Sequence, residues 1–353
     1  MSVGLDGVVA AETALSHVDG EAGTLILKGL PLDAAATLDF EGVCALLWDG
    51  LMDTQGELKA RLGAARQQAF DRVGHMLPAA DGLTPVEGLR LMLSGLADET
   101  DLDPAVQVTG AVPVFVAALD RHRRGLQPIE PSPALGQSAD FLAMLADETA
   151  DPAIVAGLDT YLVTVADHGL NASTFAARVV ASTRAGMVSS VVAALCALKG
   201  PLHGGAPGPV LDMLDAIGGE DRIDTWLDET LKQGDRLMGF GHRVYKVRDP
   251  RADVLKRAVA KLKGDRIAFA ERVEQAAIAH LARHKPGRRL ETNVEFYTAL
   301  LLDRIGLDRS LFTPVFAMGR VAGWAAHVME QEATGRLIRP QSRYVGPTPQ
   351  QAA

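Results

Sequence analysis

The sequence predicts an all-α fold of two helical domains, with a short β element near the N-terminus. Alanine and leucine dominate the composition and aromatic residues make up only 5%, a balance that favours helices packed on helices. From Leu38 onward, apolar residues recur in most segments at the i, i+3, i+4 spacing of an amphipathic helix. A chain of 353 residues also exceeds one comfortable hydrophobic core, so two domains are expected.

The elements can be placed along the chain. Residues 9–30 combine a short helical pattern with the β-type run TLILKG. Helices are expected at residues 40–52, 54–76, 87–99, 141–148, 152–167 and 173–198, over 252–284 as one or two helices, and at 293–306 and 312–334. Irregular segments are expected at 126–137, with three prolines, at the glycine-rich breaks 199–209 and 238–253, at 284–293, and in a basic C-terminal arm, 335–349. An amphipathic helical segment lies between the two glycine-rich breaks.

Composition and charge narrow the function classes. The chain is 48% hydrophobic and 22% charged, so it can bury a large core and is expected to be globular. Its net charge of −9 and isoelectric point near 5.5 argue against a nucleic-acid or anionic-membrane partner, which usually requires the opposite sign. An anionic small molecule is therefore the expected partner of the local basic clusters.

The cysteines and the apolar segments indicate a cytoplasmic protein. Cys44 and Cys196 each lie in an apolar stretch, which predicts two reduced core residues. The first ten residues lack the basic region and long apolar run of a signal peptide. The apolar stretch at 186–198 is too short for a membrane span.

Two histidines lie inside the glycine-rich breaks, His203 in GPLHGGA and His242 in GFGHRVYK. Neighbouring glycines let the backbone approach a ligand closely, and a histidine placed there can exchange a proton near neutral pH. Either one could instead be an ordinary loop histidine bonded to a carbonyl. His168, just before a helix that Asn171 or Ser173 could cap, has the same two interpretations.

His280 and His284 are spaced i, i+4 and could in principle bind a metal. The sequence offers them no acidic or cysteine partner at a useful spacing, so a solvated helix face is expected and no metal ligand is predicted.

Three arginines share an unusual setting. Arg251 follows the second glycine-rich break, Arg320 lies within the apolar run FAMGRVAGW, and Arg339 lies in the basic arm. A buried arginine needs a carboxylate or phosphate partner, which could be a structural ion pair or an anionic substrate. Common signatures, namely the Walker A loop, the strand-linked GxGxxG, HExxH and GxSxG, do not occur in the sequence.

With these residues in place, the chain resembles the citrate synthase family over essentially its whole length. The resemblance rests on six motifs in family-like order: DHGLNASTFAARVVAST (167–183), GPLHGGAPGPV (200–210), GFGHRVYKVRDPRA (239–252), NVEFYTALLL (293–302), FAMGRVAG (316–323) and RLIRPQSRYVG (336–346). It implies an all-α homodimer whose large domain comprises residues 1–203 and 304–353, and whose small domain comprises 204–303. The two domains would close over a cleft.

The resemblance also implies the reaction and the site. Citrate synthases condense acetyl-CoA with oxaloacetate and hydrolyse the resulting thioester; the coenzyme A thioester is a co-substrate, and no metal or bound cofactor is needed. By position, His203 would bond the thioester carbonyl and His242 the oxaloacetate ketone. The remaining assignments are His168, Arg251 and Arg320 as ligands of the oxaloacetate carboxylates, Arg339 reaching in from the partner subunit, and Lys246 and Arg343 as contacts of the coenzyme A phosphates.

The sequence departs from the family pattern at the catalytic base. The family usually has an aspartate in a stretch like NVDFYSG, and here the stretch reads NVEFYTA, which makes Glu295 the expected base and places Ala299 where glycine is usual. One extra methylene moves a carboxylate by roughly 1 Å, which can cost on the order of 100-fold in rate unless neighbours adjust. The run TLILKGLPL also replaces the usual arginine-glycine-tyrosine, with Lys28 near the arginine position.

Three functions therefore stay open at this point. The first is a citrate synthase with a glutamate base. The second is a 2-methylcitrate synthase that uses propionyl-CoA, since acyl pockets that differ by one methylene discriminate by only ~1–3 kcal/mol. The third is a non-catalytic homologue that binds acyl-CoA or a dicarboxylate. The intact His203, His242 and arginines favour an enzyme, because a pure binding protein does not need two poised histidines.

Overall fold

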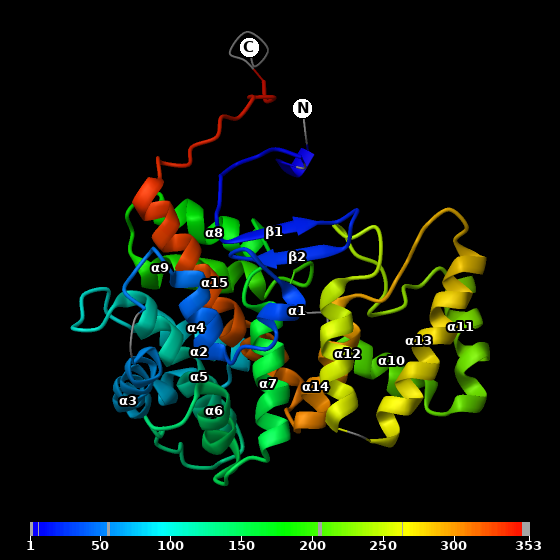
Figure 1. Cartoon of the computed structure of the whole chain (residues 1–353), viewed down its shortest axis with the longest axis horizontal. Helices are drawn as coiled ribbons and strands as arrows, with labels where there is room; N and C mark the ends of the chain where they lie inside the picture. Colours follow the sequence, from blue (N-terminus) through cyan, green and yellow to red (C-terminus); the bar gives the residue numbers. More distant parts are fainter. Residues whose placement is uncertain (1–2, 6, 55–56, 204–206, 263, 348–353) are drawn as a thin grey trace.

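The computed structural model describes residues 3–5, 7–54, 57–203, 207–262 and 264–347, and over these residues the chain is mostly helical (Figure 1). The α-helices before the first glycine-rich break are α1 (Leu32–Ala35), α2 (Phe40–Trp48), α3 (Leu58–Met76), α4 (Pro85–Ser94), α5 (Pro104–Arg123), α6 (Gln137–Ala146), α7 (Pro152–Val165), α8 (Ala172–Ala181) and α9 (Met187–Leu198). Those after it are α10 (Pro207–Ile217), α11 (Ile223–Lys232), α12 (Pro250–Leu262), α13 (Asp265–His284), α14 (Val294–Ile305) and α15 (Phe312–Thr334). Short 3-10 turns occur at Val3–Leu5, Leu77–Ala80, Glu220–Arg222 and Arg309–Leu311. The predicted all-α class is confirmed.

The short β element is a small antiparallel sheet of β1 (Ser16–Asp19), β2 (Thr24–Leu27) and β3 (Leu30–Pro31), in that order. In β2 the side chains of Leu25 and Leu27 are buried, as a strand with one face on the core requires. The helical pattern expected in this part of the chain is wrong: residues 8–15 are not helical, and the backbone of residues 16–19 pairs with β2 instead.

Several helices begin where the sequence supplies a capping side chain. The carboxylates of Asp39, Asp103 and Asp151 accept backbone N–H bonds at the starts of α2, α5 and α7, which satisfies N–H groups that have no partner within the helix. Asn171 and Asn293 do the same for α8 and α14. The last two caps matter for function because both helices start beside the candidate site.

The structure differs from the expected helices at two places. The block expected at 173–198 is two helices, because Arg184 and Gly186 adopt positive φ angles of 64° and 89° and end the first helix. Helix α5 was not predicted as a separate element. Nearly every side chain from Ala105 to Arg121 is buried, and a helix buried on all sides lacks the polar face that makes the period visible.

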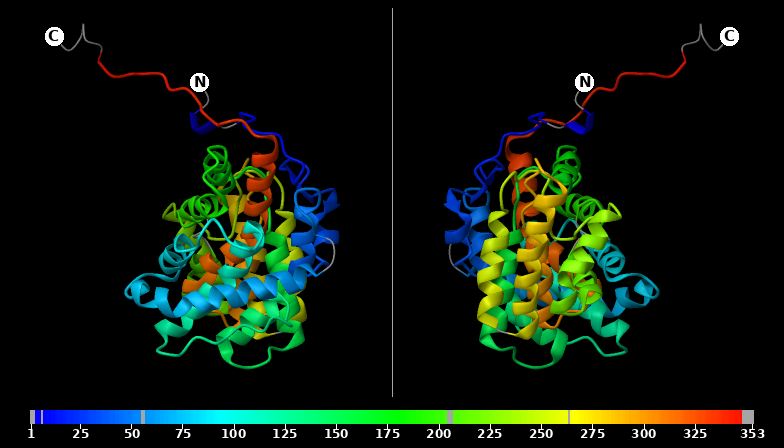
Figure 2. Two further views of the ribbon diagram at one scale, coloured as in Figure 1. Left: turned by 90° about the vertical axis from the view of Figure 1, so that its left-hand side faces the viewer. Right: turned by 90° about the vertical axis from the view of Figure 1, so that its right-hand side faces the viewer.

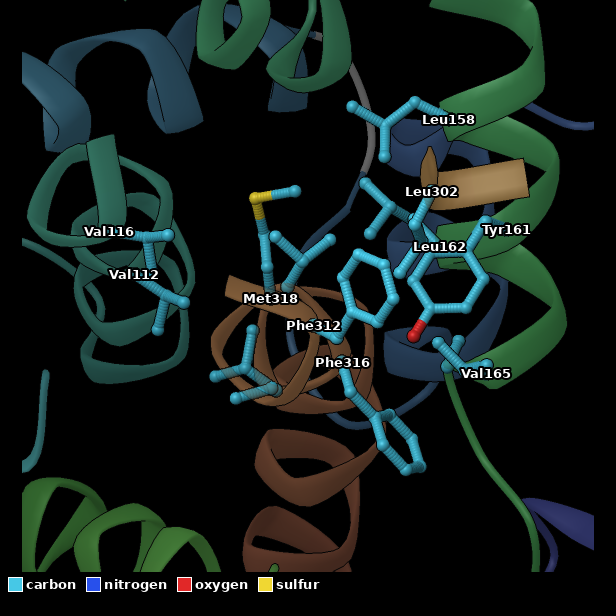
Figure 3. Close-up of a cluster of buried hydrophobic side chains, with 14 of the residues drawn as sticks. Val112, Val116, Leu158, Tyr161, Leu162, Val165, Leu302, Phe312, Phe316 and Met318 are labelled. Atoms are coloured by element: carbon cyan, nitrogen blue, oxygen red, sulfur yellow. The ribbon is translucent and has the colours of Figure 1, made fainter. Parts of the chain in front are cut away.

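The core forms where α15 meets α5 and α7 (Figure 3). Phe312, Phe316 and Met318 of α15 lie among apolar side chains of the two neighbouring helices. Close approach to α7 depends on glycine: a Cβ on Gly319 would lie 2.9 Å from the Leu162 carbonyl oxygen, and one on Gly323 would overlap the carbonyl oxygen of Ala166. This packing brings Arg320, between the two glycines, to the C-terminal end of α7.

Helices α10 to α13 gather on one side of the molecule, with α14 between them and the rest (Figure 1). Helix α12 packs against both α7 and α14. The division into domains at residues 204 and 303 stays a prediction, and Gly204 lies outside the described residues. The described part of the C-terminal arm, 335–347, is not helical and runs away from the helical body (Figure 2), as predicted.

The two cysteines differ from each other. Cys44 is buried in the core as expected, whereas Cys196 is exposed, so its assignment to the core is wrong. Helix α9 places Cys196 on its outer face, one residue after the buried Leu195. Among the described residues, no helix is both long and apolar enough to cross a membrane.

Candidate active site

A cavity of about 910 Å³ lies between the N-terminal segment, the ends of α7 and α14, and the two glycine-rich breaks. Six of the sequence-predicted site residues line it, contributed by five separate parts of the chain: His168, His203, His242, Arg251, Glu295 and Arg320. Tyr161, Val165 and Phe316, which close one wall, belong to the packed region of Figure 3. The cavity combines apolar walls with a few convergent polar groups, as small-molecule sites usually do.

The loop that carries His242 is shaped by its glycines. Gly239 and Gly241 have φ angles of 84° and 82°, a backbone region that side chains with a Cβ rarely adopt. Nδ1 of His242 accepts the backbone N–H groups of Val244 at 3.0 Å and Tyr245 at 3.1 Å. Burial and the neighbouring Arg251 lower the pKa of His242 to about 4. The ring is therefore neutral near pH 7 and carries its proton on Nε2.

Arg251 lies beside this proton and is held by a buried carboxylate. Nε of Arg251 donates to Oδ1 of Asp249 at 3.0 Å and Nη2 donates to Oδ2 at 2.9 Å. Nη2 also lies 3.2 Å from Nε2 of His242. Because both of these nitrogens carry protons, they are two donors side by side at the cavity wall. A substrate oxygen would accept from both.

His203 is oriented by the start of α8. The backbone N–H of Ser173, in the first turn, lies 3.3 Å from Nε2 of His203, and the Ser173 hydroxyl lies 2.9 Å from it. Burial and the charge of Arg320 lower the pKa of His203 to about 4. A neutral ring that accepts at Nε2 keeps its proton on Nδ1, so His203 has one N–H left to donate.

His168 is the third neutral histidine at the cavity. Burial, followed by the charges of Arg251 and Arg320, lowers its pKa well below the ordinary value. Its Nε2 lies 3.1 Å from the hydroxyl of Tyr245, and the rings of His168 and His242 meet edge to face at 5.9 Å. The expected helix cap is also present, since Asn171 accepts from the N–H groups of Ser173 and Thr174.

Glu295 lies in the first turn of α14 and faces the same cavity. Burial raises the pKa of its carboxyl to about 7, with Arg251 opposing the shift and Asp249 adding to it. Within the described residues its carboxylate has no hydrogen bond or ion pair, while its backbone N–H donates to Asn293 at 3.0 Å. A carboxylate with a pKa near neutrality and no protein partner has the properties of a general base.

Arg320 differs from Arg251 in its pairing. Its Nε donates to the carbonyl oxygen of Val165 at 2.5 Å, and its guanidinium lies 4.9 Å from the Phe316 ring centroid. No carboxylate lies within ion-pair distance of it among the described residues, and burial lowers its pKa to about 10. Arg251 thus has the structural ion pair that the sequence left open, whereas Arg320 presents a cation that an anionic substrate could neutralise.

The N-terminal sheet links two parts of this site. The Ser16 hydroxyl donates to Asp167 and accepts the N–H of Gly169 at 2.9 Å, on either side of His168. At the other end of β1, the carbonyl oxygen of Gly20 accepts the backbone N–H of Lys246 at 2.8 Å. The sheet therefore contacts both the His168 segment and the His242 loop.

Three predicted contacts lie away from the cavity lining. Lys246 is exposed and its Nζ donates to the carbonyl oxygen of Arg243 at 3.3 Å. Arg339 and Arg343 are exposed in the C-terminal arm. A single chain therefore leaves these cations unattached to the site, and their roles stay predictions.

Three positioning residues were missed by the sequence analysis. Asp249 holds Arg251 and also accepts the N–H of Val294 at 3.1 Å, so it joins the arginine to the start of α14. Asn293 caps α14 and donates to the carbonyl oxygen of Gly241 at 2.8 Å, and Tyr245 supports His168. The Asp-Pro pair at 249–250 and the asparagine before an apolar run are helix-start signals that could have identified the first two.

The reasoning about His280 and His284 was wrong in two respects. His280 is only 5% exposed, so it does not lie on a solvated face. Both histidines also have acidic partners from α11: His280 meets Asp224 at 2.8 Å and His284 meets Asp228 at 2.9 Å. Spacing along the sequence could not reveal partners that lie on another helix, more than fifty residues away.

Known proteins resemble this chain over nearly its whole length. Residues 4–341 match the family model described as citrate synthase, C-terminal domain. The chain is 39% identical to a citrate synthase of Haloferax volcanii, over 97% of this chain and 95% of the relative. It is 37% identical to a 2-methylcitrate synthase of Mycobacterium tuberculosis, over 97% and 90%.

Solved structures agree with these sequence relatives. The citrate synthase of Thermotoga maritima superposes with a TM-score of 0.87 at 35% identity, covering 98% of this chain and 96% of that one. A citrate synthase of Thermoplasma acidophilum, solved as a ternary complex with carboxymethyl coenzyme A and oxaloacetate, also gives a TM-score of 0.87, at 28% identity over 99% of this chain and 97% of that one. The resemblance of the six motifs is thereby confirmed, and this chain belongs to the citrate synthase family.

Proposed function

We propose that this citrate synthase-like acyltransferase condenses acetyl-CoA with oxaloacetate and hydrolyses the resulting thioester, giving citrate and coenzyme A. One observation carries the assignment: Glu295, with a pKa of about 7, shares a cavity with three neutral histidines and a guanidinium that has no carboxylate partner among the described residues. This set provides a base, hydrogen-bond donors and a binding charge for a dicarboxylate.

In the proposed first step, Glu295 removes a proton from the methyl group of the acyl thioester. The electron pair of the broken C–H bond moves onto the thioester carbonyl oxygen, to which Nδ1–H of His203 donates. Hydrogen bonding there stabilises the enolate, an effect worth about 2.7–4 kcal/mol for one well-placed donor. A pKa of about 7 suits Glu295 to this step, because an ordinary carboxylate is a weaker base.

In the second step the enolate carbon attacks the ketone carbon of oxaloacetate. A C–C bond forms as the ketone π bond breaks, and the ketone oxygen takes the Nε2 proton of His242, which gives the alcohol of the citryl thioester. Arg320, Arg251 and His168 would hold the two carboxylates. Water then attacks the thioester carbonyl, the C–S bond breaks and a proton from the water goes to the sulfur, so that coenzyme A leaves as the thiol. The proton that Glu295 took from the methyl group passes to His242, which restores both groups.

A 2-methylcitrate synthase is the second candidate. The identities of 39% and 37% to the two kinds of relative do not separate them. An extra methylene on the acyl group changes the binding free energy in a hydrophobic pocket by only ~1–3 kcal/mol, so the site need not distinguish the two acyl groups strongly. The substrate ratio must therefore be measured.

The test is thiol release with oxaloacetate and either acetyl-CoA or propionyl-CoA, comparing the wild type with Glu295→Gln and Glu295→Asp. We expect Glu295→Gln to abolish turnover while oxaloacetate still binds, and Glu295→Asp to lower kcat by about 100-fold because the base is displaced by about 1 Å. The ratio of the two kcat/KM values names the physiological acyl group. A wild type that binds oxaloacetate but releases no thiol contradicts the enzyme and supports a binding protein.

We also propose that the active form is a homodimer in which Arg339 of one subunit completes the site of the other. The exposed arm that carries Arg339, away from the cavity of its own chain, supports this arrangement. Mixing inactive Arg339→Ala and Glu295→Gln subunits should restore thiol release, since a mixed dimer then contains one complete site. If the mixture stays inactive although dimers exchange subunits, Arg339 does not act across the interface.

A further inference from the structure

We propose that α11 and α13 form a site for a divalent transition-metal ion, with His280, His284 and Asp228 as ligands. One ring nitrogen of each histidine and one carboxylate oxygen of Asp228 all lie within 4.8 Å of one another. None of the three lines the candidate active-site cavity. The proposal is therefore independent of the proposed function.

The geometry arises from two pairs of residues with helical spacing. His280 and His284 lie one turn apart on α13, with ring centroids 6.3 Å apart and ring planes inclined by only 13°. Asp224 and Asp228 lie one turn apart on α11 and meet these histidines at 2.8 and 2.9 Å. Helix α11 packs on α13 (Figure 1). Because residues at i and i+4 share a helix face, this packing sets two imidazoles opposite two carboxylates.

The donor types favour Zn²⁺ and neighbouring metals of the first transition row. Imidazole nitrogen and carboxylate oxygen bind Zn²⁺ at about 2.0–2.2 Å in a tetrahedral arrangement, which places ligand atoms ~3.4 Å apart. Small side-chain rotations would bring the three ligand atoms from within 4.8 Å to this spacing. Asp224, whose carboxylate lies 2.8 Å from Nε2 of His280, can supply an oxygen as the fourth ligand or hold the His280 ring in position.

The two oxygens of the Asp228 carboxylate have different partners. Nζ of Lys232 contacts Oδ2 at 2.5 Å, whereas Oδ1 faces His284. A metal can therefore take Oδ1 while Lys232 keeps Oδ2. His280 contributes a ring whose Nδ1 is buried and has no hydrogen-bond partner in the described part of the chain.

The effect of the ion would be to link two peripheral helices. Helix α11 lies at the edge of the molecule in Figure 1 and packs mainly against α13. A ligand that binds only the folded state stabilises it by mass action, so metal should raise the Tm without being required for thiol release.

The test uses full-length, tag-free protein that has been treated with a chelator and then titrated calorimetrically with Zn²⁺. We expect one saturable site per chain, and visible absorption typical of tetrahedral coordination when Co²⁺ replaces Zn²⁺. His284→Ala and Asp228→Asn should each weaken Zn²⁺ binding at least about tenfold, and both should keep wild-type thiol release. His75→Ala, at an exposed histidine on α3, is the matched control and should bind Zn²⁺ like the wild type.

The active-site histidines provide an internal comparison. His242→Ala should still bind Zn²⁺ like the wild type, because His242 lines the active-site cavity and not the face between α11 and α13. If His242→Ala loses the ion while His284→Ala keeps it, the metal binds in the catalytic cavity and the proposal is wrong. If the wild type shows no saturable uptake, the four side chains only form hydrogen bonds between α11 and α13, and the proposal is equally wrong.

Discussion

Asp249 holds Arg251 with both carboxylate oxygens, at 3.0 Å to Nε and 2.9 Å to Nη2, and the two side chains are only 1% and 5% exposed. The same carboxylate accepts the N–H of Val294 at the start of α14. One buried acid thus connects Arg251, a proposed ligand of oxaloacetate, to the helix that carries the proposed base. Both the binding charge and the position of Glu295 depend on it.

Asp249→Asn should therefore impair stability and activity together. Removing one partner of a buried ion pair leaves the other charge uncompensated, which costs about 3–5 kcal/mol of folding free energy. We expect a matching loss in chemical denaturation and a higher KM for oxaloacetate. Asp33→Asn is the control, because Asp33 forms an exposed ion pair with Arg257 and such pairs contribute about 0–1 kcal/mol. Equal stability of the two variants would contradict the buried-pair argument.

The pH dependence of kcat/KM should follow Glu295. The base must be ionised, and burial raises the pKa of this carboxyl to about 7, so kcat/KM should fall as the pH decreases below about 7. His203 and His242, with pKa values of about 4, stay neutral through this range and add no second limb there. Asp249 adds to the raised pKa of Glu295, so residual activity of Asp249→Asn should show its acid limb at lower pH. A wild-type limb near 4.5 would mean that Glu295 is solvated like an ordinary carboxylate.

Tyr245→Phe should weaken oxaloacetate binding with little effect on folding. The change removes the hydroxyl that lies 3.1 Å from Nε2 of His168 and keeps the ring that packs against His168 and His242. One neutral hydrogen bond is worth about 0.5–1.5 kcal/mol, so KM for oxaloacetate should rise about 2- to 13-fold, with kcat changed less. Tyr344→Phe, in the exposed arm, should have no effect on a single chain's site. An unchanged KM in Tyr245→Phe would show that the hydroxyl does not orient His168.

Gly323→Ala should destabilise the protein because the added Cβ would overlap the Ala166 carbonyl oxygen. Separating α15 from α7 to relieve the overlap should cost about 1–3 kcal/mol and displace Arg320, which raises KM for oxaloacetate. Gly74→Ala on α3 is a matched control, since a Cβ there meets no atom within 4 Å. That substitution should stabilise the helix by about 0.5–1 kcal/mol. Thermal unfolding of the two variants should therefore shift in opposite directions.

Much of the fold was predictable because it depends on local signals. Amphipathic periods located most helices, prolines and glycines located the loops, and Asn171 capped the helix as expected. The exceptions have physical causes. The buried helix α5 has no polar face to reveal its period, and the strand β1 depends on pairing with β2 rather than on its own pattern.

The sequence by itself determined the family motifs, the types of residue at the site and the replacement of aspartate by Glu295. Only the tertiary structure decided how these residues act. Burial lowers the pKa of His242 and keeps its ring neutral. Packing pairs Arg251 with Asp249, and Arg320 bonds the Val165 carbonyl oxygen and has no carboxylate partner among the described residues. Packing also joins His280 and His284 to acids on α11. A pKa or an ion pair depends on distances between segments far apart in the chain, and packing alone sets those distances.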